Sequence, residues 1–269
     1  MNRTVAAVAF LCGLSVGLMP GTAMAASGQS GGPYDPLNAP TFQQQTSNWT
    51  TADFAFYNSK LAQVQNFHKA KATGGAKAYY CIPQCVPNSH YATMSVIWEG
   101  SADCACGPAT ATEMYSTFTH YYAQPSKAFT LSQVETQMGF NCTVGTYRYQ
   151  LSNEMNRGTQ THNSYVWQNI ASGSDVYDYT AVDLGGVNPN TGVTYNFPPG
   201  YDGETYGING YPLDNYQGKD WQHYFPAYGY DASYNVYVAD PHFAADHHYT
   251  STAVWKFIQN FPYQAQVLW

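Results

Sequence analysis

Cys106 stands at the start of the run Cys-Gly-Pro-Ala, immediately before a stretch whose apolar residues recur at helical spacing. The apolar positions of this stretch are Ala111, Met114, Tyr115, Phe118 and Tyr122. Proline is tolerated in a helix only within the first turn, so Pro108 fixes the beginning of the helix close to Cys106. The chain must therefore place a cysteine at the amino terminus of a helix that packs one face against a core.

The first 25 residues have the pattern of an export leader. Arg3 gives a short positive end, residues 5–18 are almost entirely apolar, and Ala23-Met24-Ala25 matches a small-residue cleavage site. Residues 1–25 are therefore predicted to be a signal peptide, and the protein is predicted to be secreted and extracellular. No later stretch approaches the roughly 18 consecutive apolar residues of a membrane helix, so no membrane partner is expected.

Charge and composition narrow the range of partners. Loss of Arg3 with the leader moves the formal net charge from -7 to -8, so nucleic acid is not expected as a partner. The chain has 25 tyrosines while only 10% of its residues are charged. Such a surface is typical of peptide or glycan binding and equally of a tyrosine-rich secreted shell. Composition alone does not separate these two interpretations.

Two segments precede the predicted domain. Residues 26–50 are rich in Ser, Gly, Gln, Asn and Pro and are predicted to be a flexible lead-in. Residues 51–75 are predicted to be a helical segment, capped by Asp53 and ended by Gly74-Gly75. Because this helix precedes the domain and ends in a glycine spacer, we interpret it as a candidate inhibitory pro-segment. Residues 76–269 then form the domain, which is long enough for one large core.

The domain changes from a helical to a strand-rich texture along the chain. Further helices are predicted near 131–138 and 144–155, and strands at 94–98, 163–170, 176–182, 224–230 and 234–239. A loop rich in Gly, Pro and Asn is predicted over 185–219, and a last element over 252–258. A helical half followed by an antiparallel β half indicates the α+β class.

Cys106 has the position of a nucleophile, because the unpaired N–H groups and the dipole of a helix amino terminus favour a thiolate. The predicted base is His223, which heads one strand of a hairpin while Asp240 ends the other. A two-residue turn at Asp231-Ala232 places the two side chains opposite each other, and a four-residue turn makes them a diagonal pair. An odd-length turn without a bulge separates them. On one face, Asp240 can orient the imidazole.

Three blocks of the sequence resemble papain-like cysteine peptidases: Cys106-Gly107-Pro108-Ala109, His223-Tyr224 with Gly229-Tyr230-Asp231, and Val236 to Pro241. The resemblance is to the bacteriocin-processing, double-glycine peptidase family and its stand-alone secreted relatives, over roughly residues 90–265. It implies a papain-like fold, in which a helical half bearing the nucleophile packs on an antiparallel β half. It also implies that Cys106 is the nucleophile, His223 the general base and acid, and Asp240 the orienting carboxylate.

Two features depart from the family pattern. The family usually has an oxyanion-hole glutamine about six residues before the nucleophile, where this chain has Gly100 between Glu99 and Ser101. Loss of one oxyanion donor can lower a rate by ~10²–10³-fold. Pro226 lies inside the His223 strand, a position that proline tolerates only at a sheet edge or at a bulge.

Once the leader is removed, four cysteines remain besides Cys106, namely Cys81, Cys85, Cys104 and Cys142. Their even number predicts two disulfides in an oxidising compartment. Three pairings are open, and we favour Cys81 with Cys85 and Cys104 with Cys142. A rival interpretation treats the C-x3-C and C-x-C spacings as a zinc site, which export makes the weaker alternative.

The segment containing His242, Asp246, His247 and His248 could ligate a metal. Solvated histidines in a loop are the commoner explanation of such a cluster, so neither a metal site nor a cofactor is predicted. The remaining histidines, His68, His90, His120 and His162, are interpreted as surface residues.

The sequence therefore predicts a secreted, monomeric cysteine peptidase that cleaves peptide or isopeptide bonds in a peptide or protein substrate. Two alternatives remain open. A transglutaminase-like acyl transferase uses the same triad, and its product gains an amine instead of water. A non-catalytic peptide-binding module keeps the fold but has an ordinary thiol at Cys106.

Overall fold

The computed structural model describes residues 41–72, 79–81, 85–100, 104–121, 129–143, 145–159, 165–188, 191–204, 222–259 and 265–269. The chain from Gly32 to Trp269 forms one compact unit. The predicted signal peptide, the first part of the lead-in, Gly74-Gly75 and His162 lie outside the described residues, and so do residues 189–190 and 205–219 of the predicted loop. None of the helices that are described is long and apolar enough to cross a membrane.

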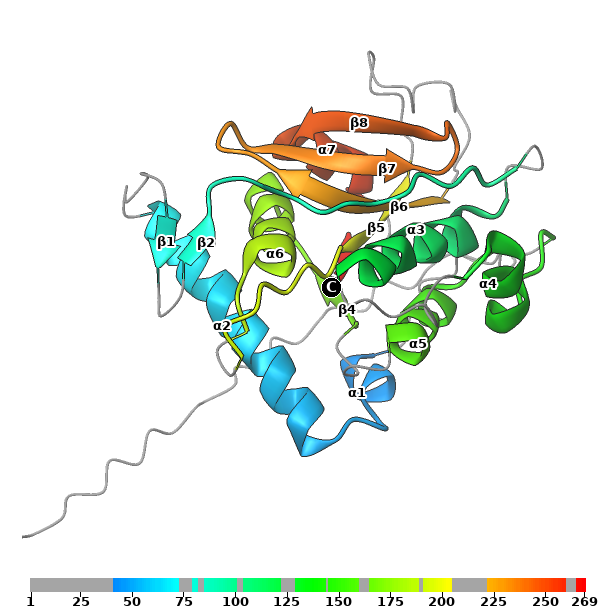
Figure 1. Ribbon diagram of the computed structural model, residues 1–269, viewed down its shortest axis with the longest axis horizontal. Helices are drawn as coiled ribbons and strands as arrows, with labels where there is room; N and C mark the ends of the chain where they lie inside the picture. Colours follow the sequence, from blue (N-terminus) through cyan, green and yellow to red (C-terminus); the bar gives the residue numbers. More distant parts are fainter. Residues whose placement is uncertain are drawn as a thin grey trace, which may run out of the picture. The chain divides into compact units, whose positions relative to one another are not determined.

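The described helices are α1 (Phe42–Gln45), α2 (Thr51–Ala72), α3 (Cys106–Tyr121), α4 (Leu131–Met138), α5 (Arg148–Thr159), α6 (Gly173–Gly185) and α7 (Ser251–Ile258). The described strands are β1 (Tyr79–Cys81), β2 (Cys85–Pro87), β3 (His90–Tyr91), β4 (Trp167–Asn169), β5 (Gly200–Glu204), β6 (Gln222–Tyr230), β7 (Asn235–Asp240), β8 (Ala245–Thr250) and β9 (Gln266–Leu268). Helices packed on an antiparallel sheet confirm the α+β class (Figure 1).

One antiparallel sheet carries most of these strands. Its order is β4-β9-β5-β6-β7-β8, and β3 adds to the far end of β6. β1 and β2 form a separate hairpin in which Cys81 and Cys85 are backbone partners. The pairing of these two cysteines as a disulfide stays a prediction.

α3 begins at Cys106, as its sequence predicts. Ala111, Met114 and Tyr115 are fully buried, and the helix packs along β6 (Figure 1). α4 also has its predicted bounds, because the Thr130 side chain accepts the Gln133 N–H and the Gln133 side chain accepts the Thr130 N–H. These two helices have local start signals, and both predictions are confirmed.

α5 begins later than predicted. The expected helix starts at Val144, whereas the observed one starts at Arg148. Gly145 has a φ of 71°, outside the helical region, and the Gln150 side chain accepts the Tyr147 N–H just before the first turn. The backbone therefore turns once before it enters the helix.

The predicted strand 176–182 is wrong, because these residues belong to α6. Eleven residues of this helix are buried, on all of its sides. A helix that is buried all round has no solvent-exposed face, so periodicity alone does not distinguish it from a buried strand. The overlooked signal is Ser172, whose side chain accepts the Asp175 N–H at the start of the helix.

The predicted loop 185–219 is also wrong in part, because it contains β5. This strand lies in the interior of the sheet, between β6 and β9. Tyr201 pairs with Phe225 on one side and with Val267 on the other. β5 has two glycines among its five residues, which is unusual for a central strand and explains why its propensity is weak.

The predicted strand 94–98 is wrong as well. Residues 92–100, here called the crossing segment, run extended past α3 without joining a sheet ladder (Figure 1). The N–H groups of Ala92, Ser95, Ile97 and Glu99 donate to Tyr228 O, Ser116 Oγ, Glu113 Oε1 and Pro241 O, respectively. Two side chains of α3 and two backbone carbonyls thus take the place of a partner strand for this segment.

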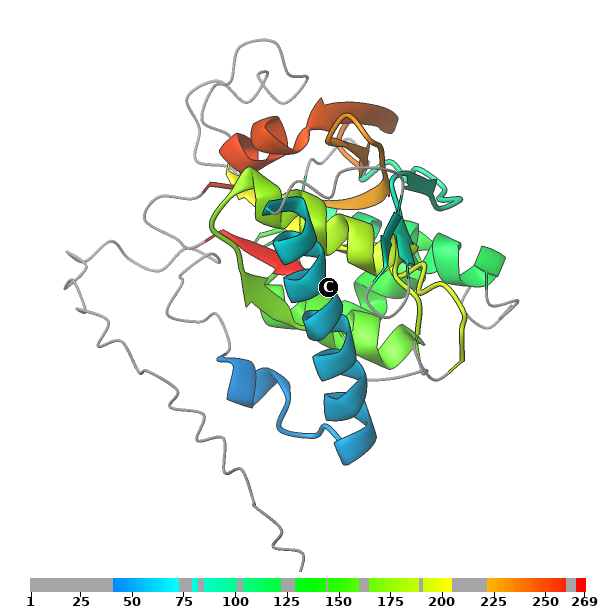
Figure 2. The ribbon, with the colours of Figure 1, turned by 90° about the vertical axis from the view of Figure 1, so that its left-hand side faces the viewer.

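α2 contributes to the core of the same compact unit. Phe56, Val64 and Phe67 are buried, and the helix packs against α6 (Figure 2). At this contact Lys60 Nζ lies 2.6 Å from Asp183 Oδ1, and both side chains are almost completely buried. The interpretation of α2 as a pro-segment stays a prediction.

Two histidines predicted to be surface residues have defined partners. His68 is 53% exposed, and its Nδ1 lies 2.9 Å from Asp178 Oδ2. His90 is half-buried, with its Nε2 2.5 Å from Asn196 Oδ1. The surface interpretation is therefore wrong for His90, which links the entry to β3 with the chain before β5.

Candidate active site

The Cys106 thiol is buried at the first residue of α3 and is free of any disulfide. Thr146 packs so closely on the next residue that a Cβ at Gly107 would lie 2.4 Å from Thr146 Oγ1, which explains why glycine follows the cysteine. The first N–H groups of a helix have no intrahelical acceptor, so Cys106 lies beside unpaired donors and the positive end of the dipole.

His223 and Asp240 meet through an odd-length turn that a bulge corrects. Tyr230 pairs with Val236, which leaves the odd number of residues 231–235 between them. The register then shifts between Gly229 and Ala227, so that one extra residue lies on β6. Continued from the Ala227–Val238 pair, this register puts His223 on the same face as Asp240, diagonally across the two strands.

The observed contact agrees with this register. His223 Nε2 lies 2.9 Å from Asp240 Oδ1, and the side chains are 3% and 2% exposed. His223 also hydrogen-bonds Cys106, for which Nδ1 is the ring nitrogen left by the Asp240 contact. The structure thus brings the three predicted site residues into one chain of contacts, with Cys106 at one end and Asp240 at the other.

The electrostatics of the pair favour its charged form. Burial lowers the pKa of His223, but the charge and hydrogen bond of Asp240, followed by the contact with Cys106, outweigh burial and raise this pKa well above its usual value. Burial raises the pKa of Asp240, but the charge of His223 and two hydrogen bonds outweigh it and lower this pKa. Imidazolium and carboxylate are therefore the preferred forms at neutral pH.

Pro226 occupies an interior strand rather than an edge. It pairs with Gly200 at the first position of β5, and it lies one residue before the bulge between Ala227 and Gly229. The N–H that proline lacks is thus absent where the ladder is already irregular. Of the two positions that tolerate a proline, the structure shows the one beside a bulge and not the one at a sheet edge.

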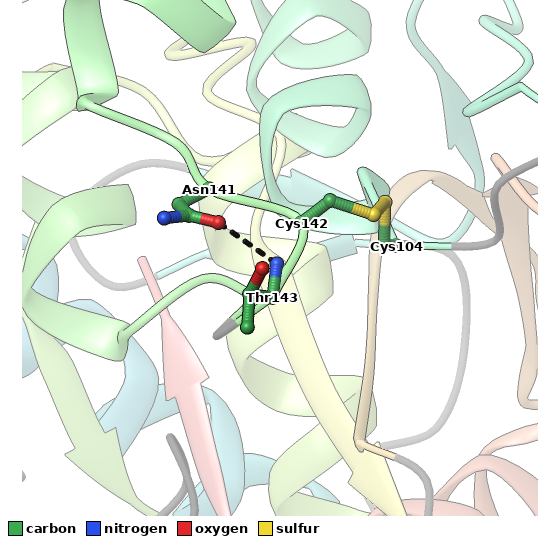
Figure 3. The surroundings of a disulfide bond; sticks show 4 residues. All are labelled: Cys104, Asn141, Cys142 and Thr143. Carbon is green, nitrogen blue, oxygen red and sulfur yellow. Dashed lines mark hydrogen bonds between the residues drawn. A yellow bond between two sulfur atoms is a disulfide. The ribbon is translucent and has the colours of Figure 1, made fainter.

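A disulfide joins Cys104 to Cys142 close to the nucleophile. It ties the residues entering α3 to the connection between α4 and α5, where Asn141 Oδ1 accepts the Thr143 N–H at 2.9 Å (Figure 3). This confirms the pairing favoured from the sequence, and it removes Cys104 and Cys142 from any zinc site.

Glu113 is a buried acid that the sequence analysis overlooked. It lies two turns after Cys106 on the same face of α3, and none of its side chain is exposed. Oε1 accepts the Ile97 N–H at 2.9 Å, and Oε2 has no hydrogen-bond partner within the described residues. Burial is the main cause that raises the pKa of Glu113 well above its usual value. The negative charge of Asp240 also raises this pKa, because it disfavours a second carboxylate nearby.

A second overlooked charge, Asp202, lies on β5. Its Oδ2 is 2.6 Å from Arg148 Nε, and the carboxylate interacts electrostatically with His223. Burial is the largest influence and raises the pKa of Asp202, against the opposing charge of Arg148. No sequence signal pointed to it, because β5 itself was interpreted as loop.

The four residues of the predicted histidine cluster do not converge. Asp246, His247 and His248 lie on β8, a strand and not the predicted loop, so neighbouring side chains point to opposite faces. His242 instead meets Glu99, with Nδ1 3.0 Å from Oε1. Within the described ranges no group of three or more His, Cys, Asp or Glu side chains is arranged to hold a metal ion.

The arrangement provides the parts of nucleophilic catalysis by a thiol. A buried sulfur contacts an imidazole that a carboxylate orients, at a helix end that favours negative charge. Against protein-family models and against curated proteins, the chain gave no match.

Proposed function

We propose that the protein is a secreted thiol hydrolase with a papain-like fold, which cleaves peptide or isopeptide bonds through an acyl-enzyme on Cys106. The observation that carries this proposal is the continuous contact from Cys106 to His223 to Asp240, with all three side chains buried. The resemblance of the three sequence blocks supports the same roles. The predicted leader and the Cys104–Cys142 disulfide support export.

The reaction follows from the protonation states of the pair. The Cys106 thiolate attacks the carbonyl carbon, and the C–S bond forms as the carbonyl π electrons move to oxygen. When the C–N bond breaks, the leaving amine takes a proton from the His223 imidazolium. Water then attacks the thioester while His223 accepts a proton from it, and the carboxylic acid and the thiolate are released. Asp240 keeps the ring oriented and its charge balanced throughout.

A transglutaminase-like acyl transferase uses the same first half-reaction, and only the acceptor differs. A peptide-binding module has no need for a charged imidazole–carboxylate pair in a buried site, where desolvation makes such a pair costly. The intact pair therefore favours catalysis over binding alone.

The test uses p-nitrophenyl acetate, which acylates reactive thiols without a known specificity. We expect intact-mass analysis to show one acetyl group on Cys106, which is then lost to water as acetate, and no acetylation of the Cys106→Ala variant. If an added amine such as ethylamine instead captures nearly all of the acetyl group as an amide, the transferase is the better assignment. A protein whose Cys106 is never acetylated contradicts both enzymes.

A further inference from the structure

The crossing segment holds the turn that follows Asp240. The backbone N–H of His242 donates to Asp240 Oδ1 at 3.0 Å, so residues 240–242 form a turn that the aspartate side chain closes. Glu99 contacts both of the other residues of this turn. Its backbone N–H donates to Pro241 O at 2.9 Å, and its Oε1 lies 3.0 Å from His242 Nδ1. One residue of the crossing segment thus fixes the backbone and a side chain of the turn.

The carboxylate of Asp240 depends on this turn for its orientation. Oδ1, which accepts the His242 N–H, is also the atom that lies 2.9 Å from His223 Nε2. Two donors from different directions therefore define the position of one oxygen. If the turn relaxes, the carboxylate loses one of these donors and gains freedom to rotate away from the imidazole.

The same segment is attached to the helix that carries Cys106. The N–H groups of Ser95 and Ile97 donate to Ser116 Oγ at 2.8 Å and to Glu113 Oε1 at 2.9 Å, and both acceptors belong to α3. The Glu99 side chain is 2% exposed, so it is enclosed by protein and is not open to a substrate. The crossing segment thus links α3 to the turn after β7 by contacts that do not pass through His223.

We propose that Glu99 is a positioning residue of the candidate active site. By holding Pro241 and His242, Glu99 keeps Asp240 in line with His223 and so sustains the reactive form of Cys106. The inference rests on the proposed function, because it needs the Cys106–His223–Asp240 arrangement. It does not need a charged His242, since Nδ1–H donates to Glu99 in one neutral tautomer as well as in the imidazolium.

The other groups that act on Asp240 stay in place when Glu99 is replaced. The titratable groups that interact electrostatically with Asp240 include His223 from β6, His247 from β8 and Glu113 from α3. Substitution of Glu99 removes none of them. A change in the reactivity of Cys106 in a Glu99 variant therefore reports the position of Asp240.

The measurement is the rate at which iodoacetamide alkylates Cys106 at pH 5, divided by the rate at pH 9. The division cancels changes in access to the sulfur, because at pH 9 an ordinary thiol is mostly ionised as well. We expect Glu99→Ala to lower this ratio by about 10-fold, an effect of the size found for residues in one hydrogen-bond network. Glu99→Gln keeps an acceptor oxygen at the same length and should restore most of the wild-type ratio.

The matched control is Gln63→Ala. Gln63 is a buried polar side chain on α2 that donates to Val187 O at 3.0 Å and to Tyr195 Oη at 2.9 Å. Its loss removes buried hydrogen bonds, as Glu99→Ala does, but leaves the turn after Asp240 intact. The ratio of this variant should equal that of wild type.

A double-mutant cycle tests whether Glu99 acts through Asp240. In Asp240→Asn the imidazolium has already lost its charged support, so addition of Glu99→Ala should lower the ratio by less than about twofold further. A further loss of about 10-fold in the double variant overturns the inference. If Glu99→Ala does not fold, His242→Ala breaks the same contact from a side chain that is 18% exposed, and the cycle is run with that variant.

The outcomes distinguish this inference from the proposed hydrolase. An unchanged ratio in folded Glu99→Ala overturns the positioning role and leaves the roles of Cys106, His223 and Asp240 intact. Equal losses in Glu99→Ala and Gln63→Ala, or no recovery in Glu99→Gln, overturn it too. Wild-type protein that shows the expected ratios but is never acetylated by p-nitrophenyl acetate overturns the hydrolase and leaves the positioning role standing. A wild-type ratio as low as that of His223→Ala overturns both.

Discussion

In two buried ion pairs of this molecule, the pKa of the aspartate is shifted in opposite directions. His223 and Asp240 lie 2.9 Å apart in the candidate site, and Lys60 and Asp183 lie 2.6 Å apart between α2 and α6. All four side chains are 3% exposed or less. Yet the pKa of Asp240 is lowered, whereas burial raises the pKa of Asp183 to about 6 against the opposing charge of Lys60.

The difference lies in how many other groups each pair contacts. Asp240 also accepts the His242 N–H, and His223 also contacts Cys106. In the described part of the chain, Asp183 Oδ2 has no hydrogen-bond partner. The Lys60 ammonium is surrounded by aromatic rings, the nearest being Trp269 at 4.7 Å. At these two carboxylates, the additional hydrogen bonds of Asp240 help to outweigh desolvation, whereas the single contact of Asp183 with Lys60 does not.

The largest expected effect is on the acetylation rate, which should depend on Asp240 and not on Asp183. Asp240→Asn keeps the shape of the side chain but removes the charge that supports the imidazolium, so acetylation of Cys106 should slow by ~10²–10⁴-fold. Asp183→Asn is the matched control at the other pair and should leave this rate unchanged. Pre-steady-state release of p-nitrophenol measures both. A comparable loss in the two variants would show that the acetylation rate does not depend specifically on the charge of Asp240.

The next effect is on the free energy of unfolding, which should fall when the Lys60–Asp183 pair is broken. Lys60→Met leaves Asp183 buried without a counter-charge, and we expect the free energy of unfolding to fall by ~3–5 kcal/mol. The double variant Lys60→Met/Asp183→Leu removes both charges and should recover most of the loss. Urea unfolding followed by fluorescence provides the measurement. A single variant within about 1 kcal/mol of wild type would mean that the pair does not hold α2 on α6.

The smallest effect concerns pH. The pKa of Asp183 is about 6 in the folded protein and about 3.8 when unfolded, so between these values the folded protein binds more protons. Its free energy of unfolding should therefore decrease as the pH rises from about 4 to 6, by about 3 kcal/mol for Asp183 alone.

The contribution of Asp240 to the free energy of unfolding depends on pH in the opposite direction, because the pKa of Asp240 is lowered on folding. Its contribution is present above pH ~4 and is lost as the pH falls through the folded value. Subtraction of the Asp183→Asn stability curve from that of wild type should isolate the decline between pH 4 and 6. A flat difference curve would contradict the raised pKa of Asp183.

The sequence alone predicts an element correctly where the residues that determine the element are close together in the chain. The Cys106-Gly107-Pro108 run places the start of α3, and Thr130 with Gln133 places α4. The roles expected of His223 and Asp240 needed only two strands and a turn, and the structure brings the two side chains together. In each case the residues that determine the geometry are near neighbours in the chain.

The sequence analysis did not predict the elements whose structure depends on tertiary packing. α6 lacks a solvent-exposed face because protein covers it on all sides, and β5 acquires its ladder from two neighbouring strands. The bulge that brings His223 onto the face of Asp240 has a similar origin. A Cβ at Gly229 would lie 2.5 Å from the Tyr91 ring, so the glycine beside the bulge leaves room for a residue far away in the chain.

The charged residues behind the site follow the same rule. Glu113 is a polar residue beside the buried Met114 and Tyr115 on the helix that carries Cys106, a pattern that could have marked it as a buried acid. Its contact with Ile97 could not be foreseen, because the crossing segment joins no sheet. Glu99 and His242 are distant in sequence and meet only because this segment ends beside β7.

The most direct test of the account is the rate at which iodoacetamide alkylates Cys106 from pH 4 to 9, mapped by peptide analysis of the unreduced protein. With an intact Cys106–His223–Asp240 arrangement, we expect rapid labelling of Cys106 alone, already near pH 5, and a shift of this reactivity to above about pH 8 in His223→Ala. Wild-type protein whose Cys106 reacts only above about pH 8, with the same profile as His223→Ala, would contradict the account.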